Sequence, residues 1–109
     1  MADKADNRRT STRHVVAIAC TITVDGAARE CTLVNLSLGG ALIEAGAKFA
    51  MGARIQVSFR VPTGEEPIDI GSTVRWSDVK ALGLQFDGLR ARDVWALNEY
   101  FKQLESAPS

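Results

Sequence analysis

The sequence predicts a mainly β domain, a small antiparallel β-barrel of six strands followed by one C-terminal helix. Six short segments between residues 15 and 86 place apolar side chains at every second position, with turn-forming residues between them. After residue 90 the apolar spacing changes to that of a helix. A chain of 109 residues, 46% of them apolar, fits one domain whose core needs no disulfide or metal to fold.

The first two strands are expected to form a hairpin. Alternate residues of the segment 15–24 form one apolar face: Val16, Ile18, Cys20, Ile22 and Val24. Asp25-Gly26 is a strong hairpin signal, and Cys31 and Leu33 continue the inward face on the return strand. If the loop has two residues, paired positions sum to 51, so Cys20 opposes Cys31; a longer loop would shift this register.

The other four strands are expected at residues 40–45, 54–61, 68–76 and 82–86. Their predicted inward residues are Ile55, Val57, Phe59, Val61, Ile68, Ile70, Val74, Trp76, Leu82, Leu84 and Phe86. Residues 62–67 form a turn region rich in Pro and Gly. Gly71 is where we expect a bend or bulge.

The helix is predicted from Val94, Leu97, Phe101 and Leu104, which share one face. It would cover one opening of the barrel, so the domain spans residues 15–104 and residues 105–109 form a disordered tail. Residues 1–14 lack apolar periodicity and are expected to form a flexible, locally basic arm.

Composition excludes several classes of function. Thirteen basic against 13 acidic residues give a formal net charge of zero, which is unlike a generally basic nucleic-acid binder. No apolar run reaches the roughly 18–20 residues of a membrane-spanning helix, and the polar N-terminus lacks the apolar stretch of a signal peptide. We therefore expect a cytoplasmic protein that binds neither membrane nor nucleic acid.

No enzyme is predicted. The single histidine, His14, stands beside arginines, and the chain has no Ser-His-Asp grouping, HExxH or GxxxxGK[ST]. Cys20 and Cys31 lack a CxxC spacing, so no metal or cofactor is expected. In a cytosolic protein they are better interpreted as buried thiols, with a redox pair as the alternative.

Two polar segments are candidates for binding. Arginines in the segment 8–13, Arg-Arg-Thr-Ser-Thr-Arg, carry planar guanidinium groups that match phosphate oxygens and stack on flat rings. The segment 35–40, Asn-Leu-Ser-Leu-Gly-Gly, lies between two strands, where Asn and Ser hydrogen-bond in turns. Gly39 and Gly40 permit positive φ and a close approach of a ligand to the backbone.

Together these segments resemble the PilZ domain family. RxxxR before the first strand appears here at residues 9–13, and [DN]xSxxG after the second begins at Asn35. The segments 71–76 and 83–86 also resemble that family's closing strands, so the resemblance covers roughly residues 7–104. It implies a six-stranded barrel with a C-terminal helix that binds the bacterial second messenger cyclic di-GMP.

The resemblance also implies roles for particular residues. Arg9 and Arg13 would hold phosphate oxygens and the Hoogsteen edge of guanine, while Asn35 and Ser37 hydrogen-bond a guanine for which Gly40 leaves room. Trp76 would stack on a base, although its position in the strand alternation favours the core. The implied site comprises Arg8, Arg9, Arg13, Asn35, Ser37, Gly39, Gly40 and Trp76.

Two residues bear on stoichiometry and affinity. Arginine before RxxxR, here Arg8, goes in the family with an intercalated ligand dimer, so two cyclic di-GMP per domain are expected. Asn35 stands where Asp is commoner, and its neutral amide predicts weaker binding.

The predicted output is a separate protein, reached when ligand orders the arm on the barrel. The process that it controls, such as motility or biofilm formation, is not named by the sequence. One alternative is a PilZ-type adaptor that acts in pilus or motility machinery without a ligand, although such members typically lack the arginine motif. A third interpretation is a small barrel that binds single-stranded nucleic acid.

Overall fold

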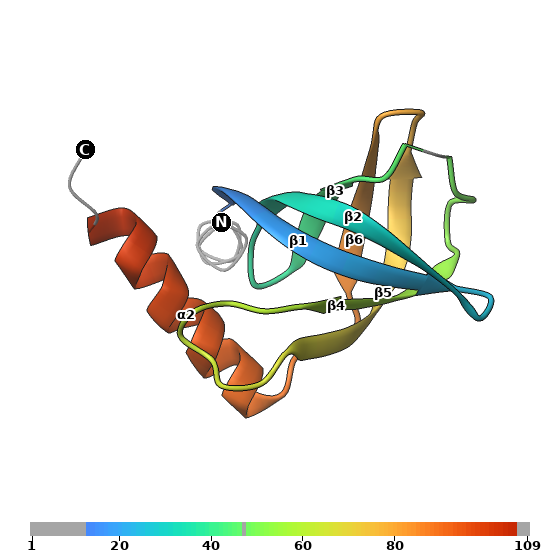
Figure 1. Cartoon of the computed structure of the whole chain (residues 1–109). Helices are drawn as coiled ribbons and strands as arrows, with labels where there is room; N and C mark the ends of the chain where they lie inside the picture. The colour runs from blue at the N-terminus through green and yellow to red at the C-terminus, as the bar shows by residue number, and fades with distance from the viewer. Residues whose placement is uncertain (1–12, 47, 107–109) are drawn as a thin grey trace, which may run out of the picture.

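The structure is a computed structural model, and it describes residues 13–46 and 48–106. Its elements are β1 (His14–Val24), β2 (Ala27–Leu36), β3 (Gly40–Glu44), β4 (Arg54–Phe59), β5 (Ile68–Ser77), β6 (Ala81–Phe86) and α2 (Ala91–Ser106). The strands form a closed antiparallel barrel in the order β1-β2-β3-β6-β5-β4 (Figure 1). The predicted fold class is therefore confirmed. β1 includes His14, and α2 continues to Ser106, beyond the predicted helix limit at residue 104.

The β1–β2 hairpin has the predicted register. Asp25 and Gly26 have φ of 51° and 82°, so both central residues take the left-handed conformation that a two-residue type I′ turn requires. Cys20 consequently pairs with Cys31. Nearer the start of β1 the register shifts between Val15 and Ile18.

The β5–β6 pair departs from simple alternation at a β-bulge between Val74 and Trp76. A bulge inserts one extra residue and reverses the side of the sheet that later residues face. Trp76 is therefore 42% exposed on the outside of the barrel, and the expectation that it packs in the core was wrong. Gly71 was also not the site of the irregularity, since it pairs in regular register with Gln56.

The core fills the barrel and continues under the helix. Side chains from all six strands contribute, and those of Ile22, Leu33 and Ile43 have no exposed surface. α2 lies at one end of the barrel (Figure 1), where Leu97 and Phe101 belong to the same buried cluster. The helix thus covers one opening, as its apolar stripe predicts.

Polar contacts near both ends help to hold α2 in place. The Thr63 hydroxyl, in the loop between β4 and β5, donates a hydrogen bond to the Ala96 carbonyl at 2.6 Å. At the other end of the helix, the His14 Nε2 atom lies 2.9 Å from the Glu105 carboxylate.

No helix in the described part of the chain is both long and apolar enough to span a bilayer.

Candidate functional site

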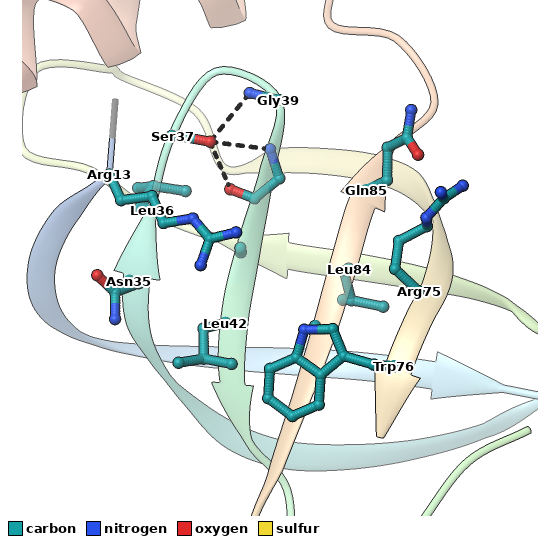
Figure 2. A pocket seen from close by; sticks show the side chains of 13 residues that line it. Arg13, Asn35, Leu36, Ser37, Gly39, Leu42, Arg75, Trp76, Leu84 and Gln85 are labelled. Atoms are coloured by element: carbon teal, nitrogen blue, oxygen red, sulfur yellow. Dashed lines mark hydrogen bonds between the residues drawn. The ribbon is translucent and has the colours of Figure 1, made fainter. Parts of the chain in front are cut away.

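A cavity of about 390 Å³ opens on the outer surface of the barrel, beside the β2–β3 turn and over β3, β6 and β5 (Figure 2). Its lining comprises Arg13, Asn35, Leu36, Ser37, Gly39, Gly40, Ala41, Leu42, Arg75, Trp76, Gly83, Leu84 and Gln85. Six of the eight sequence-predicted site residues are in this set. The other two, Arg8 and Arg9, lie outside the described residues.

Ser37 organises the turn at the rim of the cavity. Its hydroxyl oxygen accepts hydrogen bonds from the backbone N–H groups of Gly39 and Gly40, each at 3.1 Å. The same hydroxyl donates to the Gly40 carbonyl at 3.3 Å, which also accepts from the Ser37 N–H at 2.9 Å. The side chain is buried, and Figure 2 shows the bonds of its hydroxyl closing the turn. Ser37 thus shapes the backbone beside the cavity.

The two glycines of this turn lack the left-handed conformation that the sequence predicts. Neither has positive φ; among the described glycines only Gly26, Gly46 and Gly52 do. A methyl group at Gly40 would instead overlap the backbone carbonyl of Leu84, because β3 and β6 pair closely there. Glycine at position 40 is needed for the strand pairing that forms the cavity floor.

Two arginines give the cavity a positive potential. Figure 2 shows Arg13 beside Asn35 on one side and Arg75 beside Gln85 on the other. Both arginines are exposed, and none of the described lining residues is Asp or Glu. Although the whole chain has no net formal charge, this cavity attracts anions.

Trp76 supplies a flat apolar surface between these two sides. It pairs across the strands with Gly83, and a methyl group at Gly83 would overlap the indole ring. The ring therefore lies against the backbone of β6, with Leu42 and Leu84 nearby (Figure 2). A heteroaromatic base could stack on its open face.

Seven lining residues were not predicted from the sequence, and Arg75, Gln85 and Leu42 are among them. Strand alternation does place Arg75 on the outside of β5. Alternation along a strand does not predict which strands become neighbours, and it is the closed barrel that brings β3, β6 and β5 side by side around one cavity.

The two cysteines lie elsewhere, along a second cavity of about 570 Å³. Burial raises the pKa of the Cys20 thiol to about 12, and burial also raises that of Cys31. Both thiols are free in the structure, and their raised pKa values favour the protonated form at neutral pH. Within the described ranges no group of three or more His, Cys, Asp or Glu side chains could hold a metal ion.

Comparisons with known proteins identify the family. The PilZ domain model matches residues 7–103, so the chain belongs to the PilZ domain family. A comparison with curated protein sequences gives no match.

Two solved structures are similar. The Bacillus subtilis inhibitor of motility, MotI/DgrA, has 18% identity and a TM-score of 0.69 over 93% of this chain and 54% of its own. The Borreliella burgdorferi PlzA protein, solved in complex with c-di-GMP, has 26% identity and a TM-score of 0.61 over 88% of this chain and 36% of its own. This chain thus spans about half of the first protein and about a third of the second.

Proposed function

We propose that this PilZ domain is a receptor for cyclic di-GMP and binds it in the cavity beside the β2–β3 turn. The observation that carries the proposal is the composition of that cavity: two arginines, two amides and an exposed indole, without a carboxylate among its described residues. Cyclic di-GMP offers two phosphates and two guanines, the chemical groups that such side chains recognise. The family membership and the PlzA complex support the same ligand.

The lining residues that the sequence motifs predicted each have a role in this proposal. Arg13 donates to a phosphate oxygen or to guanine O6 and N7, for which a guanidinium is the matching donor. The Asn35 amide hydrogen-bonds a guanine edge. Trp76 stacks on a base, and Ser37 holds the turn so that the backbone of Gly39 and Gly40 stays close to the ligand.

Arg8 and Arg9 complete the proposed site from outside the described residues. We propose that they fold over the bound ligand with Arg13, at an ordering cost of about 1–2 kcal/mol per residue. Arg8 is proposed to favour two intercalated ligand molecules, which the molar ratio in a titration would measure directly.

The proposed output is a contact with a separate protein that responds to the ligand-bound form. His14 follows Arg13 directly and contacts α2 through Phe101 and Glu105, which offers a route from the site to the helix. Backbone amide exchange with and without ligand tests this route. Ligand-dependent protection in the last turns of α2 is expected, and identical exchange in the two states would remove the helix from the relay.

Thermal unfolding with and without cyclic di-GMP tests the receptor function, because a ligand that binds only the folded state stabilises it. At 100 times the dissociation constant the gain is about 2.7 kcal/mol. We expect a rise in Tm with cyclic di-GMP and little change with cyclic di-AMP or GTP. A similar rise with all three would indicate a general anion site, and no rise would favour the ligand-independent adaptor.

A further inference from the structure

The β-bulge in β5 gives the cavity an unusual pair of neighbours. In a regular strand Arg75 and Trp76 would face opposite sides of the sheet. The bulge between Val74 and Trp76 instead leaves both side chains exposed on the outside, and both line the cavity. The positive charge of Arg75 therefore stands next to the proposed stacking surface.

Arg75 differs in its contacts from half of the other arginines that the structure describes. Arg54, Arg90 and Arg92 each form an ion pair with a carboxylate. Arg75 takes part in none of the hydrogen bonds or ion pairs found within residues 13–46 and 48–106. An exposed guanidinium without a carboxylate partner, beside a cavity with no carboxylate lining, is available to an anion.

Arg75 and Arg13 approach the cavity from opposite sides. Arg13 precedes β1 and lies by Asn35, whereas Arg75 lies beside Gln85 at the β5 side (Figure 2). A cyclic dinucleotide carries its two phosphates at opposite sides of one ring. A ligand whose base stacks on Trp76 would lie between the two arginines, so that each arginine has a phosphate to bind.

We propose that Arg75 is an anion-binding residue of this site and holds the phosphate on the β5 side, away from Arg13. The proposal rests on the proposed function and adds to it a contact outside the two sequence motifs. Gln85 lies beside Arg75 and offers an amide N–H to the same phosphate.

The test compares Arg75→Ala and Arg75→Lys with Arg60→Ala in calorimetric titrations with cyclic di-GMP. Arg60 is a matched control, since it is also exposed but lies along the second cavity. Arg75→Ala should weaken binding roughly ten- to a hundredfold and reduce its dependence on salt concentration. Arg75→Lys keeps the charge but loses the bidentate geometry, so an intermediate affinity is expected.

The outcomes separate this proposal from the receptor function. If wild-type protein binds cyclic di-GMP and Arg75→Ala binds as tightly as Arg60→Ala, the role of Arg75 is overturned while the receptor function stands. If the wild type binds none, both are overturned. Without ligand, Arg75→Ala should have the same Tm as the wild type, because the side chain has no described partner to lose. A loss of affinity in this variant would then be due to the lost ligand contact and not to unfolding.

Discussion

The imidazole ring of His14 is stacked on the phenyl ring of Phe101, with centroids 4.1 Å apart and an angle of 8° between the planes. This contact joins the first residue of β1 to the second half of α2, and the Glu105 carboxylate extends it through Nε2 of the imidazole. His14 is 12% exposed, so its ring is largely part of the packing between helix and barrel.

Replacing His14 should therefore destabilise the domain. His14→Ala removes an aromatic pair, which contributes about 0.5–1.5 kcal/mol beyond buried area, so a loss of about 1–2 kcal/mol in the free energy of unfolding is expected. Denaturant unfolding measures it. Val15→Ala is the control, because the Val15 side chain is 84% exposed and its loss should cost little. Equal stability of the two variants would show that the stacking contributes nothing.

Truncating Arg13 should weaken ligand binding without unfolding the protein. Arg13→Ala removes charge-assisted hydrogen bonds, and a decrease in affinity of roughly ten- to a hundredfold is expected. Titration calorimetry measures the change, with Arg60→Ala as the control for the lost charge. Wild-type affinity in Arg13→Ala would exclude this arginine from the site.

Trp76 should report ligand binding by fluorescence. Its indole lines the proposed site, whereas Trp95, the other tryptophan, is 60% exposed on α2 and lines a separate cavity. A stacked guanine should quench Trp76 emission. We expect the signal to persist in Trp95→Phe and to disappear in Trp76→Phe; the reverse pattern would place the ligand at the helix.

Gly83 should be required for the position of the Trp76 indole. Gly83→Ala would push the ring off β6 and into the cavity, so weaker cyclic di-GMP binding is expected. Gly88→Ala is the matched control, because a methyl group there meets no atom within 4 Å. Calorimetry should give a lower affinity for Gly83→Ala than for Gly88→Ala. Equal affinities would contradict the role of the Trp76–Gly83 contact.

The Cys20 thiol should make stability fall at alkaline pH. The folded protein keeps the thiol proton up to a pKa of about 12, whereas the unfolded chain loses it near the ordinary cysteine pKa of 9.0. Above about pH 9 the unfolded state therefore binds fewer protons and gains stability relative to the folded state. Urea unfolding at about pH 8 and about pH 10 should show a smaller loss for Cys20→Ala than for wild type. Equal losses would mean that Cys20 ionises with an ordinary pKa in the folded protein.

Local sequence signals predicted much of this fold because the relevant interactions are local. Asp25-Gly26 specifies a two-residue turn, and that turn alone sets the pairing of Cys20 with Cys31. Alternation located the strands, and helical spacing located the stripe of α2 that includes Leu97 and Phe101.

The misplaced details depend on strands that are distant in the sequence. Trp76 faces outward because a bulge forms where β5 meets β6, and Gly83 leaves room for its ring. Gly40 is needed because the Leu84 carbonyl lies across from it. Parity counting along one strand contains no information on either neighbour, so neither outcome could be predicted from the local pattern.

The cavity beside the β2–β3 turn is proposed to bind cyclic di-GMP. Calorimetric titration of the full chain tests it most directly, with cyclic di-AMP and GTP as controls. We predict selective binding with a dissociation constant of about 1 μM or below, which corresponds to a binding free energy of about −8 kcal/mol. A ratio of two ligands per domain would support the role of Arg8. Absence of heat at saturating concentrations of cyclic di-GMP, together with an unchanged Tm, would contradict the proposal.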